Sequence, residues 1–381
     1  MSQKVLNDLE ILASKPLSNA TAMPKELYTS NEILSLEEDL IFNKEWICVG
    51  RATEIPKVGD YFTYQLGKQP IIILRDRSKK IKAMSNICLH RMMKIVEGKG
   101  NKKSFTCPYH AWTYNLDGNL VMAKYMDKTE CFNKDDLKLP ELKCEVFLGW
   151  IYVTLNNNIQ SLSKSLKSLS DVVSPYKMEN YIDIISEEHI WNTNWKILTE
   201  NFMEGYHLPV AHQGTVGPYF NVLDTEFDKR GAFECFTYQT FTKNEDAIVG
   251  TAHPKNKSLV GKWRHTSILP TIFPSHMYSL APDHLWYLSL QPQGTDKVKI
   301  KFGAAIAPEV MEDQDNPDEF LKETIKFLNH VQQEDRYVVE GIYQGVCSPL
   351  SHPGPLSWLE RENHEFTQYI SNKFLNYLVL I

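Results

Sequence analysis

Two short cysteine–histidine pairs constrain the fold of this chain more than any other feature. Cys88 and His90 form a C-x-H pair, and Cys107 and His110 form a C-x-x-H pair, with turn-forming residues between the pairs. Each pair offers one thiolate and one imidazole from a loop between expected β-segments. Two short loops can therefore meet at one metal site, which disfavours unrelated structural roles for the four residues.

Two kinds of metal site remain open at this point. Structural zinc with two cysteine and two histidine ligands is chemically possible, although zinc fingers usually group like ligands together. A mixed pair in each loop is more typical of a two-iron cluster, in which one iron takes both thiolates and the other takes both imidazoles. The residues favour the cluster and leave zinc as the alternative.

The sequence around these pairs is patterned as short strands. Runs of β-branched and aromatic residues bounded by turn formers predict strands at 60–66, 69–76, 80–87, 104–114 and 149–156. Residues 156–180 are polar and serine-rich with helical apolar spacing, which predicts a connector that carries a helix. We expect an all-β domain at 45–155, preceded by a helical segment at 1–44 that packs on the domain formed by 156–381.

The remainder, 156–381, mixes strands with helices and predicts an α+β domain. Strands are predicted at 187–193, 233–241, 284–293 and 297–306. A helix is predicted at about 195–208, with Thr193 or Asn194 as its cap. A long helix is predicted from about 318 to 342, because Asn316-Pro317 is a good start signal.

The segment ENFMEGYHLPVAH at 200–212 carries a second set of metal-binding residue types. His207 and His212 are five positions apart, which on a continuous helix would leave their rings roughly 140° apart. Pro209 disfavours helical geometry at Leu208 and cannot continue the helix. The prediction is that the chain turns there and the two imidazoles converge. Two separately satisfied surface histidines are the alternative.

A mononuclear iron site of the 2-His-1-carboxylate kind needs one more anionic ligand. On the predicted 318–342 helix, Asp335 falls in the middle of an apolar stripe, whereas Glu334 falls at its edge. A carboxylate on a buried face is costly unless a cation neutralises it. A ferrous ion would do so, and an Arg or Lys partner is the alternative.

Composition argues against several other classes of protein. The chain has 381 residues, 43% of them hydrophobic, and a net charge of −6, which is ordinary for a globular protein of two or three domains. The sequence has no basic patch interleaved with aromatic residues, which argues against nucleic-acid binding. No apolar run is long enough to cross a membrane. Seven scattered cysteines and an N-terminus without a signal-peptide pattern predict a reducing, cytoplasmic location.

Both sets of residues resemble those of the Rieske non-haem iron oxygenases. C-x-H followed by CPYHAWTYNLDG is similar to the Rieske [2Fe–2S] motif, and E-N-x-x-E-x-Y-H-x-x-x-x-H with a distant E-D is similar to the catalytic (alpha) subunit. Leu89 and Met92 stand where relatives often have Pro and Gly. The resemblance covers about 27–345. It implies a Rieske domain followed by a catalytic domain of antiparallel-sheet, helix-grip architecture.

The resemblance also implies which residues hold the two metal groups. The ligands of the [2Fe–2S] cluster would be Cys88, His90, Cys107 and His110. The ligands of a mononuclear Fe(II) would be His207, His212 and Asp335.

An electron bridge between subunits is a further implication. Glu204 takes the place of the acidic residue that links the iron-site histidine to a neighbouring subunit's Rieske histidine, His110 or, failing that, His90. Asn201 and Tyr206 match the flanking motif. Because the two centres of one chain are far apart in the family, a head-to-tail ring is expected, typically a homotrimer.

The implied reaction is O₂-dependent hydroxylation. The chain has no G-x-G-x-x-G fingerprint and no further four-cysteine cluster, so electrons would come from a separate NAD(P)H-dependent flavin or ferredoxin reductase. The segment QQEDRYVVEGIYQGV resembles monooxygenases for choline, glycine betaine, carnitine and stachydrine, which implies N-methyl hydroxylation and N-demethylation. The alternative is an aromatic-ring hydroxylating oxygenase or an O-demethylase.

Several residues are candidates for contact with a methylated-amine substrate. Aromatic residues that could form a cation–π cage are Tyr219, Phe220, Trp263, Tyr278, Trp286 and Tyr287. Arg264 or His265 is the candidate for binding a substrate carboxylate.

Overall fold

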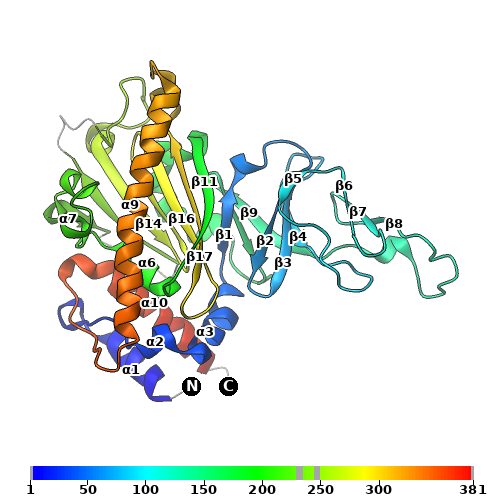
Figure 1. Cartoon of the computed structure of the whole chain (residues 1–381), viewed down its shortest axis with the longest axis horizontal. Helices are drawn as coiled ribbons and strands as arrows, with labels where there is room; N and C mark the ends of the chain where they lie inside the picture. The colour runs from blue at the N-terminus through cyan, green and yellow to red at the C-terminus, as the bar shows by residue number, and fades with distance from the viewer. Residues whose placement is uncertain (1–2, 229–234, 244–248, 379–381) are drawn as a thin grey trace. The chain divides into compact units, whose positions relative to one another are not determined.

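A computed structural model of the chain describes residues 3–228, 235–243 and 249–378. The chain divides into two compact units, each with its own sheet (Figure 1). One unit is Phe42–Lys164, and the other combines Met1–Ile41 with Ser165–Ile381. The sequence predicts these boundaries at 44/45 and 155/156.

The Phe42–Lys164 unit is built from strands, as its apolar patterning predicts. Its larger sheet is antiparallel, with the order β1-β10-β9-β4-β3-β2-β5. These strands are β1 (Ile47–Arg51), β2 (Asp60–Leu66), β3 (Gln69–Arg75), β4 (Ile81–Ser85), β5 (Lys99–Asn101), β9 (Glu141–Phe147) and β10 (Trp150–Thr154). The smaller sheet has the order β6-β7-β8 and is formed by β6 (Ser104–Thr106), β7 (Thr113–Asn115) and β8 (Leu120–Met122).

The stretch 104–114 is two short strands, β6 and β7, and not one. The loop expected to carry Cys107 and His110 lies between them, because the chain turns back there. Ala111 has a positive φ of 57°, and its N–H donates to the Cys107 carbonyl. The Cys107 N–H donates in turn to the Trp112 carbonyl. The second cysteine–histidine pair therefore lies on this turn.

The second unit is organised around an antiparallel sheet of the order β11-β17-β16-β15-β14-β13-β12. The strands are β11 (Ile182–Trp191), β12 (Thr225–Phe227), β13 (Phe236–Thr242), β14 (Thr266–Ile272), β15 (His276–Leu280), β16 (His284–Pro292) and β17 (Val298–Ile306). The strand predicted at 233–241 overlaps β13, and its first two residues lie outside the described residues. β14 and β15 were not predicted.

Helices α6 (Trp195–Met203), α9 (Pro317–Val346) and α10 (Arg361–Leu378) pack on this sheet (Figure 1). The other helices of the unit are α1 (Gln3–Ser14), α2 (Glu26–Thr29), α3 (Asn31–Glu37), α5 (Lys167–Val173), α7 (Leu208–Ala211) and α8 (Pro308–Glu312). With α4 (Leu162–Ser165), α5 confirms the helical connector predicted at 156–180. Among the described residues, no helix is both long and apolar enough to cross a bilayer.

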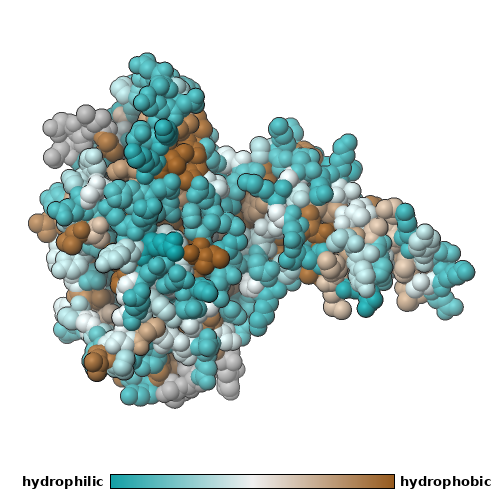
Figure 2. All heavy atoms as spheres, in the orientation of Figure 1, coloured by the Kyte–Doolittle hydropathy of each residue, from teal (hydrophilic) through white to brown (hydrophobic). Residues whose placement is uncertain are grey.

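The long helix α9 confirms the prediction for 318–342 and extends beyond it. The Asn316 side chain accepts from the Glu319 N–H, and Pro317 occupies the first turn, where its missing N–H is harmless. The helix packs on α6 and β11. Its outer surface is largely hydrophilic (Figure 2), as expected for an amphipathic helix on a sheet.

Buried polar contacts tie the N-terminal segment to α6. Glu37 accepts from the Lys196 ammonium at 2.5 Å and from the Trp195 indole at 2.7 Å. Tyr28 donates to the Glu200 carboxyl group at 2.9 Å. All of these side chains are buried. The position of α6 therefore depends on the N-terminal segment, which is far away in the sequence.

Candidate metal centres

Helix α6 ends at Met203, earlier than the predicted 195–208 helix. The Gln239 side chain on β13 donates to the Met203 carbonyl, and a Cβ at Gly205 would lie 2.9 Å from the Phe241 ring. Pro209 is not the residue that ends the helix, so that prediction is wrong. It lies in the first turn of α7, where proline is favoured. Contacts from β13 end α6 before Pro209 is reached.

This turn places His207 and His212 together with Asp335 of α9. One ligand atom from each lies within 4.8 Å of the other two. The Asp335 Oδ1 atom is 3.0 Å from His212 Nε2 and 3.7 Å from His207 Nε2. In the part of the chain that the structure describes, this is the only such group of three histidine, cysteine or acidic residues. Two imidazoles and a carboxylate are a suitable donor set for ferrous iron.

A second carboxylate orients each histidine. His207 Nδ1 is 2.6 Å from Glu204 Oε1, and His212 Nδ1 is 2.8 Å from Glu334 Oε2. When Nδ1–H donates to a carboxylate, the lone pair of the imidazole is on Nε2, the atom that faces Asp335. Both rings are therefore held in the tautomer that a metal at the triad requires.

Glu334 is a functional candidate that sequence periodicity missed. Its side chain is 16% exposed, nearly the same as the 14% of Asp335, so it does not lie at an exposed edge. Besides His212, it accepts from the Thr215 hydroxyl at 2.5 Å. Periodicity describes only the helix's own geometry, and these partners come from the segment around α7.

Charges in the site are strongly coupled. Burial alone would lower the pKa of His212, but the carboxylates of Asp335 and Glu334 outweigh burial and raise it. Burial alone would raise the pKa of Glu334, but hydrogen bonds from Thr215 and His212 lower it. The carboxylates thus stabilise positive charge at the place where the ligand atoms converge.

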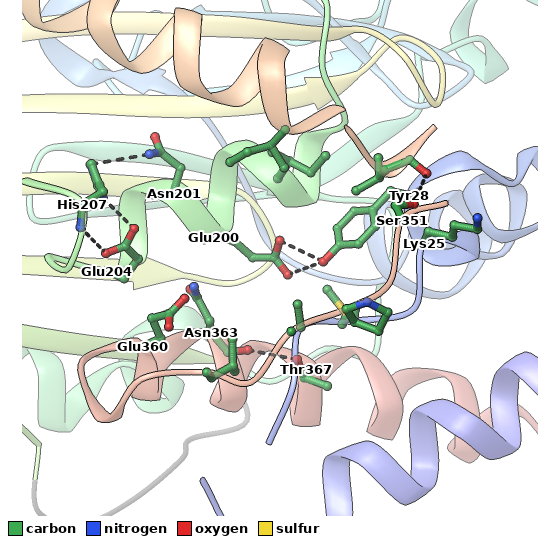
Figure 3. Close-up of a pocket in the computed structure, with 18 of the residues that line it drawn as sticks. Lys25, Tyr28, Glu200, Asn201, Glu204, His207, Ser351, Glu360, Asn363 and Thr367 are labelled. Carbon is green, nitrogen blue, oxygen red and sulfur yellow. Dashed lines mark hydrogen bonds and ion pairs between the residues drawn. The ribbon is translucent and has the colours of Figure 1, made fainter. Parts of the chain in front are cut away.

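The two flanking residues differ in position. The Asn201 amide nitrogen lies 3.5 Å from His207 Nε2, so it reaches the site (Figure 3). Tyr206 is 56% exposed and its ring lies at the surface.

A cavity of about 350 Å³ borders the Glu204 side of the triad (Figure 3). Its wall carries Glu204, Glu200, Glu360 and Tyr28. Burial raises the pKa of Glu200 to about 8, although the Tyr28 hydrogen bond and the Lys196 charge act in the opposite direction. The wall of this cavity therefore combines carboxyl groups with apolar side chains such as Ile197 and Val338.

A larger cavity of about 420 Å³ lies between the sheet and α9. Leu208, which follows His207, forms part of its wall. Of the six predicted cage residues, those that line it are Tyr219, Phe220 and Trp286. Phe241, which was not predicted, lines it as well and packs edge-on against Phe220 at 5.3 Å.

The other three predicted cage residues do not line the cavity. Tyr278 and Tyr287 are each 1% exposed, because their strand positions direct them into the core. Trp263 belongs to a 3₁₀ turn (Gly261–His265) and contacts Lys262. Aromatic content alone does not determine which face of a strand Tyr278 and Tyr287 occupy, nor that Trp263 lies on a turn outside the cavity.

The predicted carboxylate-binding residues are also elsewhere. The Arg264 guanidinium donates to backbone carbonyls of its own loop, including those of Asn256 and Ala252. His265 lies 3.5 Å from the Thr251 hydroxyl, and neither residue lines the cavity. A lysine that does line it is Lys243.

In the other unit, the two cysteine–histidine pairs occupy two loops, one after β4 and one between β6 and β7. Cys88 and Cys107 are 1% and 2% exposed, whereas His90 and His110 are exposed. The two imidazoles lie together, with their Nδ1 atoms 3.1 Å apart. The site therefore has a buried thiol side and an exposed imidazole side.

Local contacts support the thiol side. The Tyr114 hydroxyl lies 3.3 Å from Cys88 Sγ, and burial is the main cause that raises the pKa of the Cys88 thiol. A single zinc ion would need its four donor atoms within about 4 Å of one another. Among the described residues these four form no such group, which fits a two-iron cluster better than zinc.

Comparison with known families matches both units. Residues 45–133 match the Rieske [2Fe-2S] domain, and residues 176–374, more than half of the chain, match the ring hydroxylating alpha subunit (catalytic domain).

Relatives named for small ammonium compounds are among the similar proteins. The carnitine monooxygenase oxygenase subunit of Acinetobacter baumannii is 32% identical over 203 residues, which are 51% of this chain and 53% of that protein. The matched part thus spans about half of that relative. The chloroplastic choline monooxygenase of Arabidopsis thaliana is 26% identical, covering 92% of this chain and 82% of its own. The glycine betaine monooxygenase oxygenase subunit of Chromohalobacter salexigens is 27% identical, covering 88% and 82%.

Solved structures share the fold. The quaternary ammonium Rieske monooxygenase CntA superimposes with a TM-score of 0.82 at 22% identity, covering 96% of this chain and 98% of CntA. Naphthalene 1,2-dioxygenase from Rhodococcus sp. superimposes with a TM-score of 0.80 at 21% identity, covering 98% and 99%. The donor sets, the two-unit fold and the family matches agree. The chain belongs to the ring-hydroxylating alpha-subunit family of Rieske non-haem iron oxygenases.

Proposed function

We propose that this protein is an O₂-dependent monooxygenase that hydroxylates an N-methyl group of a small quaternary or methylated amine. One oxygen atom enters the methyl C–H bond, and the other leaves as water after taking up two electrons and two protons. The N-hydroxymethyl product then breaks its C–N bond, releasing formaldehyde, the demethylated amine and a proton. The observation that carries this proposal is the triad beside an aromatic cavity, in a chain whose relatives are named for carnitine, choline and glycine betaine.

The iron-binding residues in this proposal are His207, His212 and Asp335. When bound, the iron would supply the activation of O₂. Glu204 and Glu334 hold the two imidazoles with Nε2 toward the metal. The aromatic wall around Phe220 favours a methylammonium group through cation–π attraction and keeps bulk water from the reacting carbon.

In the cluster, Cys88 and Cys107 would hold the buried iron and His90 and His110 the exposed one. Exposed imidazoles are suited to passing an electron to a partner, since the other side of the cluster is enclosed. Glu204 would accept a hydrogen bond from the neighbouring subunit's Rieske histidine while it holds His207, in a head-to-tail homotrimer. The published description of CntA mentions inter-subunit electron transfer in that protein.

Two further parts of the proposal concern the cell. Electrons come from a separate NAD(P)H-dependent reductase. All seven cysteines are free thiols in the structure, which supports a reducing compartment such as the cytoplasm.

A single-turnover assay tests this function without the unidentified reductase. The iron-loaded protein is reduced chemically, mixed with O₂ and one methylated amine at a time, and analysed for formaldehyde. Formaldehyde approaching one equivalent per site, absent when the protein is left oxidised, is the expected result. If no methylated amine gives formaldehyde and an aromatic compound is hydroxylated instead, the N-demethylase proposal is wrong.

A further inference from the structure

Lys243 places a positive charge in the wall of the larger cavity. It directly follows β13, and its ammonium donates to the Val249 carbonyl at 2.9 Å and lies 4.9 Å from the Phe220 ring centre. Burial lowers the pKa of Lys243, with the charge of Asp283 acting the other way. No carboxylate of the described residues lies within ion-pair distance. A shielded cation without a counter-ion is costly, and an anionic ligand would relieve that cost.

Two carboxylates, Asp283 and Glu323, also line this cavity, and Asp283, the one whose charge acts on Lys243, is engaged by other groups. Its Oδ1 lies 2.7 Å from His284 Nδ1, and its Oδ2 accepts from the Gly250 N–H at 2.8 Å. Burial would raise the pKa of Asp283, but the His284 charge and these hydrogen bonds outweigh burial and lower it. Asp283 thus remains ionised without pairing with Lys243, and the cavity wall carries both signs of charge.

The order of side chains along the cavity gives it a direction. Phe241 contacts Gly205, in the turn that carries the iron-site histidine. Phe220 packs against Phe241, with ring centres 5.3 Å apart. The Phe220 ring also contacts the Lys243 ammonium. Residues two apart along an extended chain are separated by about 7 Å. The Phe220 and Phe241 rings therefore lie between the metal-binding residues and the Lys243 ammonium.

We infer that Lys243 is a specificity-determining residue that binds a substrate carboxylate, so that this protein selects methylated ammonium compounds that also carry a carboxylate. This inference rests on the proposed function and narrows it. The ammonium end of the substrate lies against Phe220 and Phe241, with its methyl groups toward the triad. The carboxylate end reaches Lys243. A substrate with a cation and no anion, such as choline, leaves Lys243 uncompensated and is repelled by it.

The test compares binding with turnover for substrates that differ in charge. Glycine betaine, gamma-butyrobetaine, carnitine and choline are titrated calorimetrically into the metal-loaded protein without O₂, and the same set is used for single-turnover formaldehyde release. Lys243→Met is expected to weaken binding of the three carboxylates by about ten- to a hundredfold. It should leave choline binding unchanged or improve it, and Lys243→Arg should retain most of the preference.

A matched control is Lys262→Met. Lys262 is another lysine of the same unit, pairs with Glu226 at 2.9 Å, and is 49% exposed. It does not line the cavity, so this change should leave all four affinities as they are. Iron content and the visible spectrum of the cluster establish that each variant is folded.

The outcomes separate the inference from the function on which it rests. Oxygenation of methylated amines with an unchanged carboxylate-to-choline ratio in Lys243→Met overturns the role of Lys243 and keeps the function. Wild-type protein that binds choline more tightly than the three carboxylates also overturns the role of Lys243 and keeps the function. Wild-type protein that neither binds nor oxygenates any of the four compounds overturns both.

Discussion

The two metal centres of this chain are built in opposite ways. The proposed cluster ligands come from two neighbouring loops of one unit, and the positions of Cys88 and His110 are close in sequence. The proposed iron ligands His212 and Asp335 are 123 positions apart. The cluster site is buried on its thiol side and exposed on its imidazole side, whereas the iron site surrounds its histidines with three carboxylates. A local motif is sufficient for the first centre, and the second depends on how distant elements pack.

The largest expected effect is a reciprocal loss of the two centres. Cys107→Ser should abolish the cluster spectrum and keep the mononuclear iron, because each site lies in a unit with its own core. Asp335→Ala should lose the mononuclear iron and keep the cluster spectrum. Visible absorption and metal analysis on both variants check this. Loss of both centres in either variant would show that they are not independent.

Removing the proposed bridge charge should separate electron transfer from binding. Glu204→Gln retains the size of the side chain but weakens its hydrogen bond to His207 Nδ1. We expect substrate affinity to stay near wild type while single-turnover product falls by about a hundredfold or more. Rapid-mixing spectra would follow reoxidation of the cluster. Cluster reoxidation and product formation at the wild-type rate would contradict the role of Glu204.

A smaller effect is expected from the carboxylate behind His212. Glu334→Gln should reduce the affinity for iron by about ten- to a hundredfold, as is usual when a carboxylate behind a ligating histidine is lost. Competition with a chelator measures this. Asp318→Asn, in the first turn of the same helix, is the control and should not alter iron affinity. Equal iron affinities for Glu334→Gln and wild type would show that iron binding by His212 does not depend on Glu334.

The smallest effect concerns the pH dependence of stability in the iron-binding unit. Glu200 has a pKa of about 8 when folded, well above its ordinary value of 4.5. Between these pH values the unfolded chain releases the proton that the folded chain retains, so stability falls as pH rises toward 8. Glu200→Gln should therefore raise the melting temperature by a few degrees at pH 8.5 and much less at pH 5.

Asp76 in the other unit should contribute to stability with the opposite sign. In that unit, burial would raise the pKa of Asp76, but hydrogen bonds from Lys82, Lys80 and Ser78 lower it. Its contribution to stability is present above the pKa of the unfolded chain and is lost as the pH falls through the folded pKa. Calorimetric scans of wild type and Glu200→Gln across pH test the sign for Glu200. Parallel pH profiles for the two proteins would contradict the prediction for Glu200.

Local sequence was sufficient for features whose partners are close along the chain. The caps of α9, Asn316 and Pro317, act within one helical turn, so its start was predictable. The strands β2, β3 and β4 follow one another along the chain, and each pairs with its neighbour in sequence. Each of them has an alternating or continuous apolar run. The two cysteine–histidine pairs are equally local. The spacing within each pair predicts two loops that share one metal group, and the structure brings the two imidazoles of these loops together.

The tertiary structure decided the rest, because the deciding partners are distant. Gln239 and Phe241 on β13 end α6, although the sequence places the break at Pro209. Glu334 acquires its role from His212, which is 122 positions away. Lys243 lines the cavity and Arg264 does not, since packing, and no local pattern, determines which cation faces the cavity. The sequence alone determined the kinds of metal-binding groups, and packing determined how each is held and what the cavity beside them can bind.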